Sequence, residues 1–362
     1  MPVYQREMLN FTIPSGLLDG AYEEGGELDL YAAFPAEFIV KRDKDGNWCE
    51  FNSGTGEYES LITGLNGTVN CIAEAPDGKI YVGGAFTDAG GVTDADRLAR
   101  WNPVSEAWEA VVAGINSSVN AMAFDAYGDL YIGGAFTDLG SANGDRIVKI
   151  TNLDGTPTIS ALGTGLNGVC FSIAISPNGD VYAGGGFTLA GGAANTSRIA
   201  KWTFDYVGYT WVPLATGLNN AVRTLAFAPN GDLYIGGEFT DTDYPYLCKW
   251  NGTMFSAVGT KTDINNSVWS LTFGATGYLY AGGNFTDAGG IANADYIARW
   301  NGTSWEALGT GVNNLVRSIA IKSGKAYVGG LFNIAGGLTL TDRVAVWSNG
   351  AWQPLDIDIP GA

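Results

Sequence analysis

The sequence of 362 residues contains no histidine. Histidine is the commonest general base, the central member of Ser-His-Asp triads and a frequent metal ligand, so its absence excludes most of that chemistry. The chain has no apolar run approaching the length of a membrane span, and its start, MPVYQREMLNFTIPSG, lacks a basic segment followed by an apolar one. The sequence therefore predicts neither membrane insertion nor a secretory signal.

Charged residues are also scarce, at 15% of the chain, compared with about 25% in typical soluble domains. Those present are mostly acidic, with 37 Asp and Glu against 19 Lys and Arg and a formal net charge of -18 at pH 7. Nucleic-acid binders normally carry a basic face, so we expect no nucleic-acid partner. The acidic excess favours solubility or, as an alternative, supplies carboxylate oxygens for calcium.

The chain has only four cysteines: Cys49, Cys71, Cys170 and Cys248. They show no Cys-x-x-Cys spacing and lie in apolar, strand-like segments. This setting predicts buried free thiols rather than a disulfide framework or a zinc site. We therefore expect no cofactor, apart from the calcium that the acidic composition leaves open.

Glycine, in contrast, is abundant, with 53 residues, and much of it lies in a repeated motif. The motif reads YVGGAFT, YIGGAFT, YAGGGFT, YIGGEFT, YAGGNFT and YVGGLFN, and its copies begin at Tyr81, Tyr131, Tyr182, Tyr234, Tyr280 and Tyr327. Successive copies lie 46 to 52 residues apart. A period near fifty with strand-like alternation indicates the blades of a β-propeller, each a four-stranded sheet.

Each unit is predicted to contain four strands in a meander. Residues 222–227 are apolar and alternating, and the sequence APNG that follows is typical of a tight turn. The diglycine motif forms the second strand. A third strand ends at Trp101, and a fourth begins at Trp108.

A degenerate unit is predicted before residue 64. Phe51 and Tyr58 have the same seven-residue spacing as Trp101 and Trp108, although the diglycine is missing there. We therefore expect an all-β fold, a seven-bladed β-propeller with four antiparallel strands per blade, over residues 28–362. Residues 1–27 are expected to form an N-terminal arm outside the repeat.

The diglycine that ends the second strand and the aromatic pair that flanks the last turn resemble the repeat of the Kelch propeller family. Residues 101–108 are close to that signature, and residues 300–305 and 347–352 are shortened versions of it. The resemblance covers residues 28–355. The copies are also similar to GGxFT-type repeats of microbial surface proteins and phage structural proteins, which implies display or adhesion. Family members similar to galactose oxidase use copper bound by histidines, which this sequence lacks.

Two features of the repeat have both a structural and a functional interpretation. No GxxxxGK sequence follows the diglycines, so a phosphate loop is excluded and close backbone approach is favoured. Aromatic pairs would suit stacking on sugar rings, but their recurrence in successive units favours packing between blades. The pairs are Trp101 with Trp108, Trp202 with Trp211, Trp300 with Trp305, and Trp347 with Trp352.

Acidic and amide side chains recur in loops on one rim of the predicted propeller. The candidate metal ligands, in loops after the second strand, are Asp88, Asp138, Asp241 and Asp287. The connections between units carry Asn66, Asn116, Asn167, Asn219, Asn265 and Asn313. Their oxygens would suit calcium or carbohydrate hydroxyls. Asn and Asp are also ordinary turn formers, and we favour that role.

One strand position departs from the repeat. The second residue of the first strand reads, in successive units, Asp29, Asn70, Asn120, Phe171, Arg223, Trp269 and Arg317. A position that the scaffold does not dictate is available for function, and simple tolerance of variety is the competing interpretation. We expect this position near the mouth of the central channel. Phe171, Arg223, Trp269 and Arg317 are predicted to bind a ligand or partner there, because Trp and Arg are enriched at interaction hot spots.

One loop after the diglycine is atypical. The sequence DTDYPY at residues 241–246 replaces the usual glycine-rich loop. Tyrosine offers contact area at a low cost in conformational entropy. Tyr244 and Tyr246 are therefore predicted to belong to a recognition patch.

Together these features predict a protein that is not an enzyme. The first hypothesis is a recognition or assembly module of a virion or extracellular surface, such as a phage tail, fibre or capsid-associated protein or an adhesin, whose partners are surface glycans or neighbouring protein subunits. The second is a cytoplasmic Kelch-like scaffold for protein interactions. The third is a hydrolase or lyase that uses paired carboxylates or tyrosines, but no carboxylate pair stands out.

Overall fold

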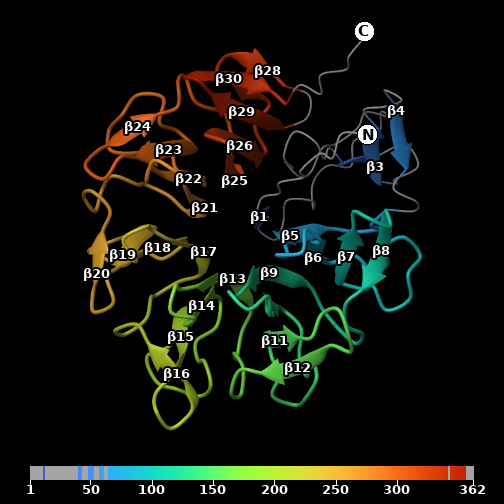
Figure 1. The fold of residues 1–362 in the computed structure, drawn as a ribbon. Helices are drawn as coiled ribbons and strands as arrows, with labels where there is room; N and C mark the ends of the chain where they lie inside the picture. Colours follow the sequence, from blue (N-terminus) through green and yellow to red (C-terminus); the bar gives the residue numbers. More distant parts are fainter. Residues whose placement is uncertain are drawn as a thin grey trace.

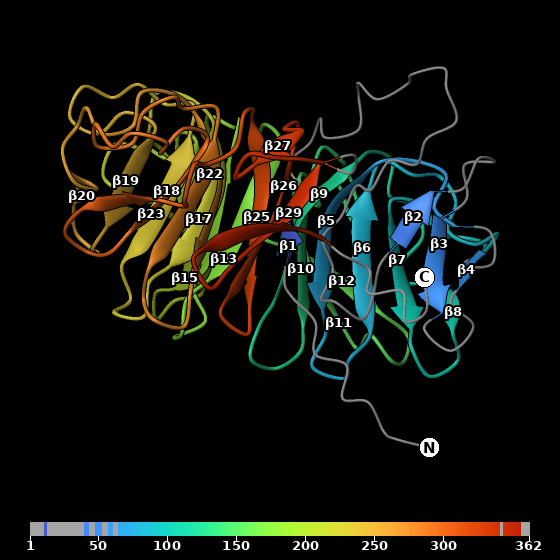
Figure 2. The same cartoon turned by 90° about the horizontal axis from the view of Figure 1, so that it is seen from above.

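The computed structural model describes residues 11–12, 40–42, 48–52, 57–60, 64–340 and 343–355. Regular structure within these residues consists of β-strands, numbered β1 to β30. Antiparallel sheets stand around a common centre in chain order (Figure 1). Seen edge-on, the strands run between the two faces of the ring (Figure 2). The described part of the chain is therefore an all-β propeller, as the repeat predicts.

Blades 1 to 3 each contain four strands that follow one another from the centre outward. Blade 1 consists of β5 (Val69–Glu74), β6 (Ile80–Gly84), β7 (Leu98–Asn102) and β8 (Ala107–Ala110). Blade 2 consists of β9 (Val119–Phe124), β10 (Leu130–Gly134), β11 (Ile147–Thr151) and β12 (Thr158–Ala161). Blade 3 consists of β13 (Cys170–Ile175), β14 (Val181–Gly185), β15 (Ile199–Phe204) and β16 (Tyr209–Pro213).

Blades 4 to 6 repeat this order, and blade 6 has a small extra hairpin. Blade 4 consists of β17 (Val222–Phe227), β18 (Leu233–Gly237), β19 (Leu247–Trp250) and β20 (Phe255–Ala257). Blade 5 consists of β21 (Val268–Phe273), β22 (Leu279–Gly283), β23 (Ile297–Trp300) and β24 (Trp305–Ala307). Blade 6 consists of β25 (Val316–Lys322), β26 (Lys325–Gly330), β29 (Val344–Ser348) and β30 (Ala351–Pro354). The extra hairpin consists of β27 (Ile334–Ala335) and β28 (Leu338–Thr339).

The prediction of seven four-stranded blades is wrong, because the propeller has 6 blades of four strands within the described residues. In the described part of the degenerate first unit, three strands form a separate sheet: β2 (Val40–Arg42), β3 (Trp48–Asn52) and β4 (Glu57–Ser60). Phe51 and Tyr58 are opposite each other in this sheet, as their spacing predicts. The unit lacks the diglycine on which the contact between the first two strands of a blade depends, which is a physical reason for its departure from the pattern.

Strand β1 (Phe11–Thr12) adds to the inner edge of blade 1. It pairs antiparallel with β5 and also contacts β9 and β25, so it lies near the centre of the ring (Figure 1). The remainder of the predicted arm, residues 1–27, lies outside the described residues, as does Asp29. No helix in the described part of the chain is long and apolar enough to cross a membrane.

Strand boundaries within a blade follow the predicted pattern. β17 spans Val222–Phe227, the segment in which apolar residues alternate. In the turn that follows, Gly231 has a φ of 89° and its N–H donates to the Ala228 carbonyl oxygen at 2.9 Å. A positive φ of this size suits glycine because a Cβ would be strained there. The APNG sequence therefore forms the predicted tight turn.

The diglycine is required by two close approaches, one for each glycine. A Cβ on Gly236 of blade 4 would lie 2.7 Å from Val268 Cγ1, so the first glycine lets blade 5 pack closely. A Cβ on Gly237 would overlap the Ala221 carbonyl oxygen in the connection before β17. These contacts confirm the structural interpretation of the motif, in which glycine permits close backbone approach.

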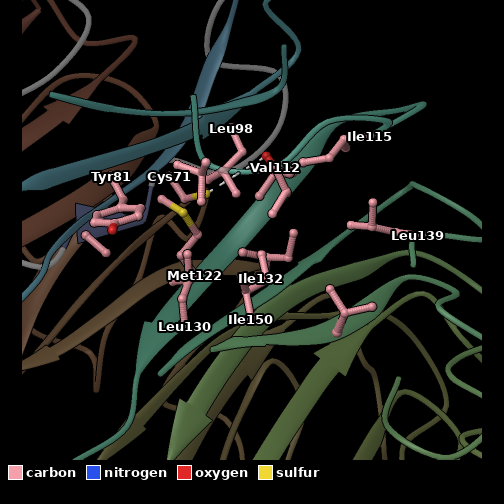
Figure 3. Packing of buried hydrophobic residues seen from close by; sticks show 14 of the residues in the cluster. Cys71, Tyr81, Leu98, Val112, Ile115, Met122, Leu130, Ile132, Leu139 and Ile150 are labelled. Carbon is pink, nitrogen blue, oxygen red and sulfur yellow. Dashed lines mark hydrogen bonds between the residues drawn. The ribbon is translucent and has the colours of Figure 1, made fainter. Parts of the chain in front are cut away.

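Apolar side chains fill the spaces between neighbouring blades. Figure 3 shows one such cluster, in which Tyr81 and Leu98 of blade 1 lie with Met122 and Ile132 of blade 2. The phenylalanines that follow the diglycines have no more than 1% of their surface exposed, and they are Phe86, Phe136, Phe187, Phe239, Phe285 and Phe332. The repeated aromatic residues therefore stabilise the ring by removing apolar surface from water.

The tryptophan pairs also pack within the protein. Trp101 and Trp108 lie opposite each other on β7 and β8, with ring centroids 5.4 Å apart. In blade 3, Trp211 Nε1 donates to the carbonyl oxygen of Leu162, at the end of blade 2, at 2.8 Å. This contact crosses between blades and supports the predicted packing role over stacking on sugars.

Three of the four cysteines are buried free thiols, as predicted: Cys71, Cys170 and Cys248. Burial raises the pKa of Cys170 to about 12 and raises the pKa of the other two thiols as well. A thiol that stays protonated is a poor nucleophile and a poor metal ligand. The side chain of Cys49 lies outside the described residues.

Candidate functional site

The variable position of the repeat is a β-bulge in each of the 6 blades. In blade 4, Val222 is opposite Gly237 and Thr224 is opposite Gly236, so Arg223 has no opposite residue in the register. The same shift occurs between the first two strands of the other blades. The bulged residues are Asn70, Asn120, Phe171, Arg223, Trp269 and Arg317. A bulge changes the direction of a side chain and frees it from the pairing pattern.

The bulged residues of blades 3 to 6 form a row, which we call the arginine–aromatic row: Phe171, Arg223, Trp269 and Arg317. The Arg223 guanidinium carbon lies 4.2 Å from the centroid of the Phe171 ring and 4.7 Å from that of the Trp269 ring. The Arg317 guanidinium carbon lies 4.8 Å from the Trp269 ring. All four side chains are half-buried. The structure therefore brings together the four residues that the sequence predicts as a binding group.

The row lies on the innermost strands, at one rim of the ring. β13, β17, β21 and β25 are the strands of blades 3 to 6 that lie nearest the centre (Figure 1). The bulged residue is the second of each strand, close to the connection from the preceding blade. The second strand of each blade ends at the same level, where its last glycine pairs with the first residue of the first strand. The loops that follow the second strand therefore begin at the same rim.

One carboxylate accompanies the row. Arg223 Nε donates to Glu238 Oε1 at 2.9 Å, and Arg223 Nη2 lies 2.7 Å from the same oxygen. Glu238 directly follows the diglycine of blade 4. Sequence reasoning missed this residue, although a signal was present, since the equivalent positions hold Ala85, Ala135, Gly186, Asn284 and Leu331.

Two guanidinium groups lie over one indole ring, and this setting affects the ionisation of Arg317. Burial lowers the pKa of Arg317, and the positive charge of Arg223 lowers it further. Trp269 is held in place by a hydrogen bond from its Nε1 to Ser267 Oγ at 3.1 Å. The row therefore holds two arginines in a protein whose overall charge is strongly negative, and Arg223 is paired with Glu238.

On blades 1 and 2 the bulge position holds amides instead. Asn70 Nδ2 donates to Asn120 Oδ1 at 2.9 Å, and Asn120 Nδ2 donates to the Cys170 carbonyl oxygen at 3.3 Å. Both asparagines are buried, so their polar atoms need partners inside the protein. In these two blades the bulge links neighbouring blades through hydrogen bonds.

The structure does not place Tyr244 and Tyr246 with the row. They lie in the loop between β18 and β19 of blade 4, and both are half-buried rather than exposed. The Tyr244 ring packs against Phe255, with centroids 5.6 Å apart. Tyr246 has a φ of 63° and donates its N–H to the Phe239 carbonyl oxygen at 2.8 Å. These contacts pack the loop against the rest of blade 4.

Three of the four aspartates that are candidate metal ligands accept hydrogen bonds from backbone N–H groups through their carboxylates, Asp88 and Asp287 within turns and Asp241 across to the preceding connection. Asp88 accepts a hydrogen bond from Gly91 N at 3.2 Å, and Asp287 accepts one from Gly290 N at 2.8 Å. Asp241 accepts from Asn219 N at 3.2 Å, and the N–H of Asp138 donates to Asp145 Oδ1 at 3.0 Å. No group of three or more His, Cys, Asp or Glu side chains with metal-binding geometry occurs in the described residues.

The asparagines between blades have a structural role. Asn116 Oδ1 accepts a hydrogen bond from Thr137 N at 3.0 Å, and its Nδ2 donates to Thr137 Oγ1 at 3.0 Å. Asn167, Asn219 and Asn265 bond in a similar way to the threonine of their own blade. Each pair ties the connection between blades to the loop after the second strand, as expected for a turn-forming amide.

The described residues form a β-propeller with 6 blades of four strands, and one family model of a propeller domain matches part of the chain. Residues 51–145 match the family model described as the Rax2 C-terminal beta propeller domain. This match covers less than half of the chain and stands as a similarity. A search of curated proteins gives no match.

Two similar solved structures are both of virginiamycin B lyase from Staphylococcus aureus. The selenomethionine-substituted protein is 12% identical, with a TM-score of 0.48, over 80% of this chain and 84% of the lyase chain. A catalytically inactive histidine-to-alanine variant with quinupristin is 14% identical, with the same TM-score of 0.48 and the same coverage of 80% and 84%. The lyase activity in these names is a property of the Staphylococcus aureus proteins.

Proposed function

We propose that this propeller is a non-enzymatic recognition module whose partner docks on the arginine–aromatic row at the centre of blades 3 to 6. The observation that carries the proposal is the stacking of Arg223 and Arg317 on the ring of Trp269, with Phe171 at the end of the row. Arg and Trp dominate the binding energy of many protein interfaces. Here they occupy bulges, where blade pairing does not dictate the residue.

The chemistry around the row supports binding over catalysis. Arginine stays protonated and does not act as a general acid or base at neutral pH. Glu238 is held by Arg223, and the sequence has no histidine to act as a general base. A glycosidase-type mechanism needs two carboxyl groups flanking the bond to be cleaved, and among the described residues the carboxylate paired with the row is that of Glu238, which Arg223 already binds.

The proposed partner is a protein, as in the assembly hypothesis derived from the sequence. The same proposal includes a role on a particle or cell surface, where the partner would be a neighbouring subunit. The resemblance to repeats of microbial surface and phage structural proteins motivates this setting. A rigid ring with a preformed row suits recognition, because little side-chain entropy is lost on binding.

The test is association with the cell or particle fraction that contains the native protein. Trp269→Ala is expected to weaken co-sedimentation by at least about tenfold, because it removes the ring on which both arginines stack. Circular dichroism and the melting temperature establish that the variant is folded. Undiminished association of a folded Trp269→Ala protein contradicts the proposal.

A matched control is available on the opposite rim. Tyr206 lies at the tip of the hairpin between β15 and β16, with 98% of its surface exposed. Tyr206→Ser removes an exposed aromatic residue at a distance from the row. It is expected to leave co-sedimentation unchanged, and an equal loss in both variants would show that the association does not depend on the row.

A further inference from the structure

The outer hairpin of blade 3 is longer than the corresponding hairpins of the other blades. It consists of β15 and β16, the two strands of the blade farthest from the centre (Figure 1). Beyond the pair of Trp202 and Trp211, its pairing continues for two more residue pairs and ends with Phe204 opposite Tyr209. In the other described blades, at most one pair follows the equivalent position. Blade 3 therefore carries an extension that the repeat does not require.

The extension continues the tryptophan pair with two more aromatic rings. Trp202 and Phe204 are two positions apart on β15 and so share one face of the hairpin, with Trp211 and Tyr209 opposite them on β16. We call these four residues the aromatic ladder. The Tyr209 ring stacks with Trp202 at an interplanar angle of 14° and a centroid distance of 5.9 Å. It also meets the Phe204 ring at an angle of 66°, with centroids 5.4 Å apart. The rings of the ladder therefore form one continuous group.

The aromatic ladder runs from the interior of the protein to its surface. Trp211 has 4% of its surface exposed, whereas Phe204 has 59% exposed and Tyr209 has 65%. In the other blades, no aromatic residue occupies the positions two residues beyond the pair. Recurrence assigns the tryptophan pairs to packing, and that argument does not apply to Phe204 and Tyr209. Exposed apolar side chains that contact each other are a typical feature of binding sites.

The extension offers little to a charged ligand. Residues 203–210 contain one charged side chain, that of Asp205. Its carboxylate accepts hydrogen bonds within the turn from Val207 N at 3.2 Å and from Gly208 N at 3.1 Å. The net charge of the chain is -18, so an anionic lipid surface or another polyanion is repelled. A neutral ligand meets no such repulsion.

The exposed area of the aromatic ladder is also small. Because an aromatic side chain presents about 150–250 Å² and these two are partly covered, Phe204 and Tyr209 together expose roughly 200–300 Å². A stable protein interface buries about 800 Å² on each partner. The ladder is therefore too small to hold a folded protein or a second copy of this chain, but it is large enough for a ligand of the size of a few sugar rings.

Neutral hexopyranose units suit a surface of this size and charge. Such a ring has C–H groups on its faces and hydroxyl groups around its edge, so a face packs on an aromatic ring while the hydroxyls stay hydrated. We infer that the exposed end of the aromatic ladder, Phe204 and Tyr209, binds a neutral carbohydrate chain. The ladder lies on the rim opposite the arginine–aromatic row, so the inference adds a second ligand class to the proposed protein partner.

The test is electrophoresis of the full chain in native gels that contain a neutral polymer, because a polymer that binds the protein retards it. The neutral probes are hydroxyethylcellulose, laminarin and galactomannan, and carboxymethylcellulose is the anionic counterpart. We expect at least one neutral polymer to retard the protein, and added salt to leave the retardation unchanged because no charge takes part. Retardation by none of the neutral polymers would overturn the inference.

Variants of the hairpin locate the site. Phe204→Ala and Tyr209→Ala are each expected to weaken polymer binding about five- to tenfold, the range for losing one aromatic contact. Phe204→Tyr keeps the ring and is expected to retain most of the binding. Both side chains are exposed, so the melting temperature is expected to stay close to that of the original protein.

Tyr206→Ser is the matched control within the same hairpin. Tyr206 has 98% of its surface exposed, but it lies beyond the last residue pair and so outside the aromatic ladder. Its replacement is expected to leave retardation by the neutral polymer unchanged. An equal loss in Tyr206→Ser and Tyr209→Ala would overturn the inference, because binding would then follow exposed aromatic residues in general.

Other occupants of the aromatic ladder are outcomes of the same variants. Co-sedimentation with phosphatidylcholine vesicles that Phe204→Ala abolishes, without polymer retardation, would assign the ladder to a membrane surface and overturn the inference. A dimer in analytical ultracentrifugation that Phe204→Ala dissociates would overturn it in favour of a second copy of the chain. Trp269→Ala is expected to leave polymer retardation unchanged, so the outcome at the ladder and the outcome at the row are decided separately.

Discussion

At the scale of single residues, the position in the repeat decides what an arginine does. Arg97, Arg146 and Arg198 lie just before the third strand with φ values of 65°, 66° and 68°. Arg146 Nη1 donates to the Ala135 carbonyl oxygen at 2.7 Å, so this arginine fastens the loop after the diglycine. Arg223 and Arg317, at bulges, stack on aromatic rings instead. The same side chain fastens a loop at one position and lies over an aromatic ring at the other.

The buried thiols give a prediction that depends on pH. Cys170 has its pKa raised to about 12 by burial, whereas an unfolded cysteine ionises near about pH 8.5. Its contribution to stability is therefore fully present below about pH 8.5 and is lost as the pH rises toward 12. At about pH 9, where unfolded thiols are largely ionised, we expect alkylation of Cys170 in the folded protein to be at least about 100-fold slower than in urea.

The measurement is iodoacetamide labelling followed by peptide mass spectrometry, which reports each cysteine separately. Cys71 and Cys248 are expected to behave like Cys170, because burial raises their pKa values too. Denaturation in urea is the control that shows all sites can react. Rapid labelling of Cys170 in the native protein would contradict the burial described here.

At the scale of an element, the diglycine and the bulge form one structural unit. The bulge places two residues of the first strand opposite one of the second, and the second glycine leaves room for the carbonyl group that precedes it. Sequence repetition identifies the glycines, because they recur in every copy. The bulged residue cannot be identified in this way, because strand pairing does not restrict the residue type at that position.

Gly237→Ala tests whether the close approach between the diglycine and the preceding connection is needed for stability. Its Cβ would overlap the Ala221 carbonyl oxygen, which is backbone and cannot rotate away. We expect a loss of about 1–3 kcal/mol in the free energy of unfolding, measured by urea denaturation. Gly208→Ala is the matched control, because its Cβ would meet no described atom within 4 Å, and it is expected to change stability by less than about 0.5 kcal/mol. A neutral Gly237→Ala would mean that the close approach is not needed.

The sequence predicts the individual strands and turns more accurately than the number of blades in the ring. The alternation in Val222–Phe227, the APNG turn and the pairing of Trp101 with Trp108 are all confirmed. The predicted number of blades was wrong because the aromatic spacing at Phe51 and Tyr58 indicates the pairing of two strands and does not by itself indicate a whole blade. Spacing reports local pairing, whereas blade formation also needs the close approaches that only the diglycine permits.

The candidate site was predicted in part for a similar reason. Phe171, Arg223, Trp269 and Arg317 emerged as departures from a repeat, and the structure brings them into contact. Glu238 was missed because it lies in the loop that follows β18, 15 residues after Arg223, and not at the bulge position. The half-burial of Tyr244 and Tyr246 was also not predicted, because it depends on packing against residues distant in sequence, such as Phe255.

At the scale of the whole molecule, the net charge of -18 is the dominant electrostatic property. Carboxylates that are distributed over a compact ring repel one another, and this lowers stability when little salt is present. We expect the melting temperature, measured by calorimetry, to rise by a few degrees when sodium chloride is added to a low-salt buffer.

Calcium chloride at matched ionic strength separates screening from specific binding. Because the rim aspartates are engaged in turns, calcium is expected to raise the melting temperature no more than sodium does. A specific ligand of the folded state would add its own stabilisation, which grows with concentration. A larger, saturable effect of calcium would contradict the turn role assigned to Asp88 and Asp287.

The bulges have a consequence for how such a protein changes over time. In blades 3 to 6, a residue outside the register of its strand pair can be exchanged without disturbing the hydrogen bonds of that pair, so each of these blades offers one replaceable side chain at the same level of the ring. Exchanging two of them, such as Arg223 and Arg317, would alter what the centre attracts while the scaffold stays intact. Duplication of a blade-forming segment thus supplies both a stable frame and a row of independent positions, and a new specificity can arise one blade at a time.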